Sequence, residues 1–329
     1  MIAAMPTVSI VVPVFNGRDY LVDVFSSIKH QVYSDFEVIF VDDGSTDGSL
    51  NELKRLSDDS LGFDIKIVQM NHKGLAAARN RGILASSGEF VSFLDCDDYW
   101  YPNKISTQIE AFSDPKIGAV FSKISYFDSE LEFVNLRKNQ EVIVDNPKSI
   151  LDGEFIVFGG GSNILCRREI LVACGGFDET LAFAEDLDLW LRVAALTQIK
   201  EIEICTVRIW IRSNSMQRKP NPIIQSRILQ DRLRIYQKWL GILDEASIAN
   251  LSKEFVDSSI DSVRKFRFLE LILRTSIWLK FFIIWVFFSP KEVVYRSAKV
   301  CKFVLLGFRK RFGDFCAKIV HRRFPSAET

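Results

Sequence analysis

The feature that most limits the possible folds is an alternation of apolar runs and polar loops between Val8 and Leu94. Each apolar run has the length of a β-strand, and the first three are followed by segments with helical periodicity. The predicted strands are Val8 to Phe15, Phe36 to Val41, Ile65 to Gln69 and Phe90 to Leu94; the predicted helices are Tyr20 to His30, Ser49 to Leu56 and an Ala-rich segment ending at Ala85. This alternation predicts an α/β fold with a doubly wound sheet whose loops gather at one edge.

The fourth apolar run ends in three carboxylates within four residues, Asp95, Asp97 and Asp98. A buried strand of an open α/β sheet delivers the residues after it to the crevice where such sheets bind ligands. Carboxylates this close repel one another unless a cation or hydroxyl donors share the site. The structural alternative is that Asp98 caps a helix before Pro102. Capping explains one acid rather than three, so a ligand site is favoured.

The usual glycine-rich phosphate loops, G-x-G-x-x-G and G-x-x-x-x-G-K-[ST], are both missing from the sequence. A phosphate bound at this edge would therefore meet a metal ion and basic side chains. A nucleotidyltransferase would be expected to carry a glycine-rich basic loop after the first strand, and Val14 to Arg18 matches that pattern poorly. A nucleotidyltransferase is kept as an alternative enzyme class.

The six cysteines are scattered and form no C-x-x-C pair, which favours reduced thiols and a cytoplasmic protein. No signal peptide is expected ahead of the strand that begins at Val8. Lys and Arg balance Asp and Glu at 42 each, but fifteen of the basic residues and only three acids lie between Arg264 and Arg323. An acidic body with a basic tail predicts an anionic surface as the partner of the tail.

The segment 266–288 is highly apolar, but four charged residues interrupt it. Its longest unbroken apolar run, Phe281 to Phe288, is far shorter than the roughly twenty residues that span a bilayer. The pattern predicts a helix lying on the inner face of the membrane, with attraction from the basic segment 296–323. Packing on the catalytic domain or on a dimer partner is the alternative. A nucleic-acid partner is not expected. The predicted division is a catalytic domain at 1–220 and a helical C-terminal region at 221–329.

Four motifs then occur in order: VSIVVPVFNG, EVIFVDDGSTDGS, AAARNRGILASSGEFVSFLDCDD and GGFDETLAFAEDLDLWLR. Together they resemble the inverting, nucleotide-sugar-dependent glycosyltransferases of family 2, which have a mixed α/β sheet known as the GT-A fold. The resemblance covers about residues 7 to 215. It implies transfer of a sugar, with inversion, from a nucleoside diphosphate to a hydroxyl of a saccharide or lipid-linked acceptor, assisted by Mg²⁺ or Mn²⁺. A non-catalytic sugar-nucleotide-binding protein is the remaining alternative.

The resemblance also implies a donor site, with a UDP-sugar as the expected donor. Its implied members are Pro13, Phe15 and Asn16 beside the base, Asp43 accepting from a uracil-like ring N–H, Lys73 and Arg79 near the diphosphate, Asp95 at the ribose or at the ion through water, and Asp97 on the metal. The structural alternative is that Asp42 or Asp43 caps the turn before Thr46. Arg212 stands where the family commonly has a histidine, and an arginine binds phosphate rather than metal. His72 is expected to be an exposed loop residue.

The last motif predicts a helix whose inward face carries Leu187, Trp190, Leu191 and Ala194. In that phase Asp188 faces solvent and pairs with Arg192. The resemblance makes Asp186 the catalytic base, because a carboxylate must take the acceptor hydroxyl's proton. It places Gly161, Ser162 and Glu185 at the acceptor region. The alternative is that Glu185 and Asp186 only favour the helix N-terminus electrostatically.

Overall fold

A computed structural model of the chain describes residues 7–58, 62–127, 132–134, 141–152, 155, 161–210 and 222–242. The chain divides into two units, Met1–Phe266 and Arg267–Thr329, and every described residue belongs to the first. The amphipathic segment at 266–288 and the basic segment at 296–323 lie outside the described residues. Among the described residues, no helix is long and apolar enough to cross a membrane.

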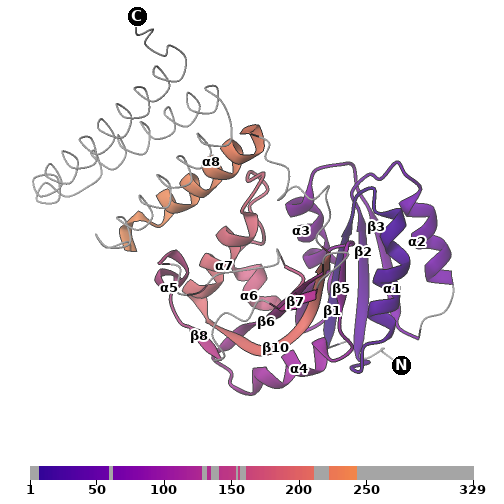
Figure 1. The fold of residues 1–329 in the computed structure, drawn as a ribbon, viewed down its shortest axis with the longest axis horizontal. Coiled ribbons are helices and arrows are strands. Elements are labelled where there is room, and N and C mark those ends of the chain that lie inside the picture. The colour runs from indigo at the N-terminus through magenta and orange to yellow at the C-terminus, as the bar shows by residue number, and fades with distance from the viewer. Residues whose placement is uncertain are drawn as a thin grey trace, which may run out of the picture. The chain divides into compact units, whose positions relative to one another are not determined.

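The N-terminal half is the predicted alternation of strands and helices. The strands are β1 (Val8–Val14), β2 (Phe36–Asp42), β3 (Asp64–Gln69) and β4 (Phe90–Phe93), and the helices between them are α1 (Leu21–Lys29), α2 (Ser49–Asp58) and α3 (Leu75–Ala85). These strands pair in parallel in the order β3-β2-β1-β4. The chain moves outward from β1 to β3 and then returns past β1 to β4. Right-handed crossovers therefore place α1 and α2 on one face and α3 on the other (Figure 1).

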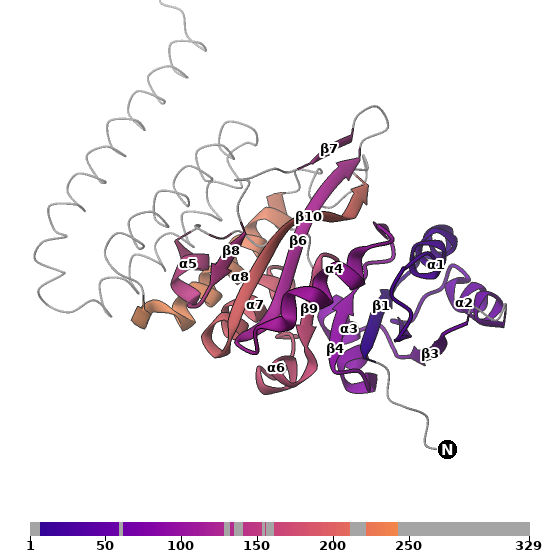
Figure 2. The same cartoon turned by 90° about the horizontal axis from the view of Figure 1, so that it is seen from below.

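The C-terminal half continues the sheet with mixed strand directions, which confirms the predicted α/β class. The strands are β5 (Asp98–Trp100), β6 (Ile117–Phe127), β7 (Glu132–Val134), β8 (Val142–Val144), β9 (Ile164–Arg167) and β10 (Gln198–Trp210). Within the described residues the main path is β3-β2-β1-β4-β9-β6-β10-β5. Strands β6 and β10 are long and lie side by side (Figure 2). Strand β7 pairs with β6, whereas β8 pairs with β10, both in antiparallel fashion.

The helices of this half are short, apart from two. They are α4 (Lys104–Glu110), α5 (Pro147–Leu151), α6 (Arg168–Ala173), α7 (Glu185–Leu196) and α8 (Pro222–Lys238), with single turns at Ala111–Ser113 and Leu240–Ile242. The predicted inward phase of α7 is largely correct, because Trp190, Leu191 and Ala194 are buried, although Leu187 is only half-buried.

Close packing between α3 and the sheet depends on a missing side chain. A Cβ at Gly82 would lie 2.1 Å from Cγ1 of Val11, which is fully buried in β1. Contacts shorter than van der Waals distance force neighbouring atoms to move. The glycine therefore lets α3 approach the sheet closely, and Arg79, in the first half of α3, reaches Asp95 at the edge where the strands end.

Candidate active site

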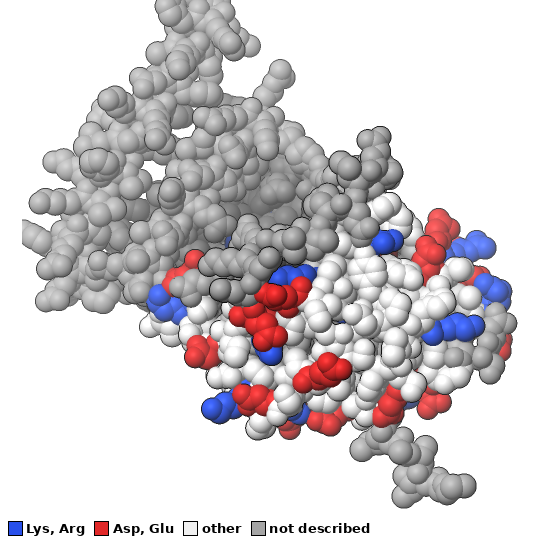
Figure 3. All heavy atoms as spheres, turned by 60° about the horizontal axis from the view of Figure 1, so that its bottom comes forward, with Lys and Arg blue, Asp and Glu red and all other residues white. Residues whose placement is uncertain are grey.

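The carboxyl ends of β1, β2 and β4 meet at one edge of the sheet, as parallel strands require. Residues that follow these strands meet residues at the start of α3 and α7 there. On the face of the molecule that Figure 3 shows, acidic and basic side chains are interspersed.

The first part of the site joins the loops after β1 and β2. The exposed ring of Phe15 stacks on His72 with 4.0 Å between centroids, and His72 Nδ1 lies 2.9 Å from Asp43 Oδ2. The expectation that His72 is exposed is correct, but the sequence did not reveal these partners. Asn16, at φ 51°, accepts from the Thr46 N–H at 2.8 Å. Pro13, by contrast, is buried within β1 opposite Val41.

Asp43 is almost completely buried and already has partners. Its two carboxylate oxygens accept the backbone N–H groups of Lys73 and Gly74, each at 2.8 Å, just before α3. The N–H groups at the start of a helix lack partners within the helix, so this carboxylate satisfies them from a neighbouring strand. The side chain of Lys73 is exposed. Asp42, rather than Asp43, accepts from Ser45 N–H within the turn that precedes Thr46, at 3.3 Å.

The second part of the site is an ion-pair bridge through Arg79. Its Nη2 donates to both oxygens of Asp95 at 2.8 and 3.0 Å, and its Nη1 donates to Glu185 at 3.0 Å. Arg79 is fully buried; although burial opposes its charge, Asp95 and Glu185 raise the pKa of the guanidinium. The bridge joins α3, the loop after β4 and the first turn of α7. No local sequence pattern connects positions 79, 95 and 185.

Ser162 connects the loop before β9 to the acidic loop, which is the segment 95–98 after β4. Its hydroxyl donates to Asp98 Oδ2 at 2.6 Å and accepts the Asp95 N–H at 3.0 Å. The preceding residue, Gly161, adopts φ 145°, and a Cβ there would lie 3.5 Å from the guanidinium of Arg79. The two glycine-loop residues expected near the acceptor therefore contact the acidic loop and the Arg79 bridge.

The prediction that Asp98 could cap the following helix is wrong. Asp98 lies in β5, and the residue at the N-cap of α4 is Asn103, whose side chain makes no capping hydrogen bond. Burial, together with the charges of Asp95 and Asp97, raises the pKa of Asp98 well above its ordinary value. The same influences raise the pKa of the Cys96 thiol to about 12. The acidic loop thus concentrates negative charge at one point.

These residues fit a divalent cation that is shared with a phosphate ligand. The carboxylate of Asp97 is exposed, that of Asp95 is partly exposed, and both follow the same strand. No group of three or more metal-ligating side chains occurs in the described part of the chain. Mg²⁺ is usually held by one or two carboxylates plus substrate phosphates and water, so two carboxylates suffice. Arg212, expected at the diphosphate, lies outside the described residues.

An open pocket of about 290 Å³ lies beside Asp97, between the start of α1 and the pair β5 and β10. It is lined by Tyr20, Asp23, Cys96, Asp97, Asp98, Tyr99, Arg208 and Trp210. Aromatic faces with a few polar groups are usual in sites for small polar ligands.

The third part of the site is the first turn of α7. Asp186 is half-buried, and its Oδ1 accepts the Leu187 N–H at 2.7 Å. Burial raises the pKa of Asp186, and burial together with the charge of Asp186 raises the pKa of Glu185. The residue before the helix, Ala184, has φ 57°, which is unusual for a residue with a side chain.

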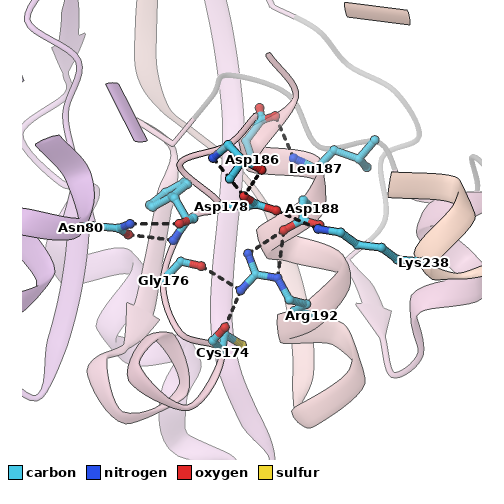
Figure 4. Close-up of polar contacts among 11 residues, drawn as sticks. Asn80, Cys174, Gly176, Asp178, Asp186, Leu187, Asp188, Arg192 and Lys238 are labelled. Atoms are coloured by element: carbon cyan, nitrogen blue, oxygen red, sulfur yellow. Dashed lines mark hydrogen bonds and ion pairs between the residues drawn. The ribbon is translucent and has the colours of Figure 1, made fainter. Parts of the chain in front are cut away.

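Asp188, two residues further on, is placed differently from the prediction. Its pairing with Arg192 is confirmed, with Oδ2 at 2.9 Å from Nε and 2.7 Å from Nη2. Its expected exposure is wrong: Asp188 is 0% exposed, and its Oδ1 also accepts from Lys238 of α8 at 2.9 Å (Figure 4). The helix phase placed Asp188 in solvent because Asp188 borders the apolar face of α7. In the structure, Lys238 of α8 contacts this position.

Comparison with known proteins now gives the family. The sequence pattern described as Glycosyl transferase family 2 matches residues 9–175. The chain belongs to this family. The match contains Phe15, Asp43, Arg79, Asp95 and Asp97 and ends before Asp186.

The curated relatives are glycosyltransferases. The chain is 31% identical over 191 residues to UDP-Glc:alpha-D-GlcNAc-diphosphoundecaprenol beta-1,3-glucosyltransferase WfaP of Escherichia coli, covering 57% of this chain and 70% of WfaP. It also matches uncharacterized glycosyltransferases of Rickettsia species at 30% identity, and it spans about a third of their length.

Solved structures share the GT-A fold. Staphylococcus aureus TarS 1-349 in complex with UDP-GlcNAc superimposes with a TM-score of 0.58 at 20% identity, covering 82% of this chain and 79% of that one. The mannosyltransferase PcManGT of Pyrobaculum calidifontis, in complex with GDP-Man and Mn²⁺, gives a TM-score of 0.57 at 17% identity, covering 92% and 81%. At this identity the likeness shows the fold alone.

Proposed function

We propose that this chain is an inverting glycosyltransferase that moves a sugar from a nucleoside diphosphate to a hydroxyl of a saccharide or lipid-linked acceptor. One observation carries the proposal. Arg79 binds Asp95 and Glu185 at once, so the acidic loop after β4 and the turn that bears Asp186 are held together at the sheet edge. Groups suited to holding a diphosphate and a group suited to accepting a proton thus occupy one place.

The donor is expected to lie over the loops after β1 and β2. The exposed Phe15 ring on His72 offers an apolar face for a base, and Asn16 borders it. Asp43 would accept from the base with lone pairs left over from its two backbone donors, while Pro13 would shape the floor of the site from within β1.

Lys73 and Arg212 would approach the diphosphate, whereas the buried Arg79 would act on it through Asp95. The TarS and PcManGT complexes contain a UDP-sugar and a GDP-sugar, and a UDP-sugar remains our expected donor.

A divalent ion, Mg²⁺ or Mn²⁺, would be held by Asp97 directly, while Asp95 would contact the ribose or reach the ion through water. When bound, it would neutralise the charge that develops on the departing nucleoside diphosphate. The presence of Mn²⁺ in the PcManGT complex supports this assignment. Ser162 keeps the loop in shape by bonding the Asp95 N–H and the Asp98 carboxyl.

Asp186 is the proposed base. The acceptor oxygen attacks the anomeric carbon, Asp186 takes the hydroxyl proton, and the bond from that carbon to the phosphate oxygen breaks with its electron pair leaving on the nucleoside diphosphate. Burial raises the pKa of Asp186, which makes its carboxylate a stronger proton acceptor than an exposed one. Gly161, Ser162 and Glu185 would border the acceptor.

The acceptor of WfaP, as its name states, is a GlcNAc-diphosphoundecaprenol, so a lipid-linked saccharide is a reasonable acceptor class here. Such a substrate would suit a protein held on the inner membrane face by the basic, amphipathic C-terminal region. We propose this cytoplasmic, peripheral location and the division at residues 220 and 221 on the sequence pattern.

The test separates binding from transfer. UDP-, GDP- and dTDP-sugars are screened for metal-dependent binding by calorimetry. Transfer to a GlcNAc-diphosphoprenol acceptor is measured as the amount of nucleoside diphosphate released. Asp186→Asn should keep donor affinity and lower transfer by about 10² to 10⁴-fold, the usual contribution of a positioned base. The control Glu169→Gln replaces an exposed acid in the first turn of α6 and should match the wild type.

The same measurements address the alternatives. Donor binding without transfer or hydrolysis in the wild type would indicate a non-catalytic sugar-nucleotide-binding protein. Release of pyrophosphate from a nucleoside triphosphate would indicate a nucleotidyltransferase. Full activity of Asp186→Asn would refute Asp186 as the base.

A further inference from the structure

Helix α8 makes polar contacts with the segment that carries the proposed base, although it lies outside residues 9–175, which match the family. Asp231 of α8 is buried, and its Oδ2 accepts the backbone N–H groups of Ala182 and Phe183, each at 3.0 Å. These residues are the second and third before Glu185, where α7 begins.

The backbone between these contacts and the base is strained. Ala184 adopts φ 57°, a conformation that residues with a Cβ rarely take. Such a conformation costs free energy and persists only where the surroundings determine it. The two hydrogen bonds that Asp231 accepts from the N–H groups just before Ala184 supply such a constraint. Their direction fixes how the chain enters α7, and therefore where Asp186 points.

A second contact comes from Lys238, the last residue of α8. Lys238 Nζ donates to Asp178 Oδ2 at 2.8 Å and to Asp188 Oδ1 at 2.9 Å (Figure 4). Asp178 lies ahead of the segment that leads into α7, and Asp188 lies in the first turn of α7. Although burial opposes it, the bond from Lys238 helps lower the pKa of Asp178 to about 2. Lys238 thus joins the two ends of the segment that contains Asp186.

Arg192 completes the arrangement from the opposite side. Its Nη1 donates to the carbonyl oxygens of Cys174 and Gly176, and its other nitrogens bind Asp188. Asp188 therefore lies between a cation of α7 and a cation of α8. The turn that carries Asp186 is anchored on both sides, and one of the two anchors comes from α8.

We propose that α8 is a positioning element of the transfer site, in which Asp231 and Lys238 hold the segment 178–188 so that Asp186 is directed at the acceptor. This inference rests on the proposed role of Asp186. Neither residue touches the reacting atoms; both act through the backbone and the salt bridges of the segment that bears the base. Donor binding, which is assigned to the loops after β1, β2 and β4, does not depend on these contacts.

The experiment uses full-length Asp231→Ala, with UDP-glucose and a GlcNAc-diphosphoprenol acceptor as probes. Displacement of a catalytic group by about 1 Å can cost on the order of 10²-fold in rate. Turnover should fall by about 10 to 100-fold while donor affinity stays within about twofold. The amides of Ala182 and Phe183 should exchange with solvent at least about tenfold faster, a readout that needs no substrate. Asp231→Asn keeps an acceptor oxygen, so it should keep most of the turnover and most of the protection of the two amides from exchange.

Two further variants complete the test. Lys238→Met should lower turnover with donor affinity kept, and Lys238→Arg should rescue it; its side chain is 45% exposed, so this pair keeps the test decisive if Asp231→Ala does not fold. Gln237→Ala is the control, because that side chain is exposed on the same helix and no polar contact of the described residues joins it to the segment 178–188.

Wild-type turnover in Asp231→Ala and Lys238→Met, or a parallel loss of donor affinity, would overturn the inference, as would unchanged amide exchange. Failure of the proposed function looks different. In that case Asp186→Asn stays active, whatever the α8 variants do.

Discussion

Asp188→Asn should destabilise the protein far more than Asp186→Asn, although the residues are two positions apart. Asp188 is fully buried and accepts two bonds from Arg192 and one from Lys238. Asparagine keeps the shape and one acceptor oxygen but turns an amide NH₂ group toward one of the two cations. The substitution therefore leaves positive charge without its counter-ion inside the fold.

The magnitude follows from burial and from the remaining partners. Removing one member of a buried ion pair costs about 3 to 5 kcal/mol. Here Arg192 is 25% exposed and Lys238 45% exposed, so water compensates part of the loss. Arg192 also keeps its bonds to the Cys174 and Gly176 carbonyls. We therefore expect Asp188→Asn to lower the free energy of unfolding by about 2 to 3 kcal/mol.

Asp186→Asn is the matched comparison. Burial raises the pKa of Asp186, which means that the fold disfavours its charged form. Removing that charge should change the free energy of unfolding by less than about 0.5 kcal/mol, or stabilise the protein slightly. The substitution should act on turnover instead.

Urea unfolding of the two full-length variants measures the difference, since a shift of midpoint at constant m reports stability. Circular dichroism follows the transition at pH 7. A loss below about 0.5 kcal/mol for Asp188→Asn, or an equal loss for both variants, would refute the reasoning.

Three other perturbations have defined outcomes. Asp97→Asn should remove the dependence of nucleoside-diphosphate binding on Mn²⁺ or Mg²⁺ in calorimetric titration, while far-UV circular dichroism stays unchanged; undiminished metal dependence would contradict the assignment. Glu37 is buried, but bonds from Lys66, Ser87 and Ser9 lower its pKa from 4.5 to about 2, so its contribution to stability is present above about pH 4.5 and is lost as the pH falls toward 2. Glu37→Gln should flatten that part of the urea-midpoint profile, and an unchanged profile would count against the bonds. Gly82→Ala should lower the free energy of unfolding by about 1 to 3 kcal/mol through overpacking against Val11. Leu84→Ala, on the exposed side of α3, should lower it little. Equal effects of the two substitutions would show that α3 packs against the sheet in another way.

The strands and helices of the N-terminal half, and the helix after Asp186, could be predicted from the sequence because they depend on local periodicity. The apolar runs that became β1, β2 and β4 are buried along their length, and the i, i+3, i+4 spacing after Asp186 placed Trp190 and Leu191 inside. The acidic loop after β4 was also visible, since a strand end fixes which residues reach the sheet edge.

Contacts between distant segments could not be predicted in this way. Arg79 bridges Asp95 and Glu185, and Lys238 reaches Asp188, only because the faces of α3, α7 and α8 meet the same edge. Helical phase alone put Asp188 in solvent, because a boundary position is exposed unless another helix covers it. Periodicity records which side of an element is apolar, whereas the neighbour that covers a polar position is chosen by the packing of the whole chain.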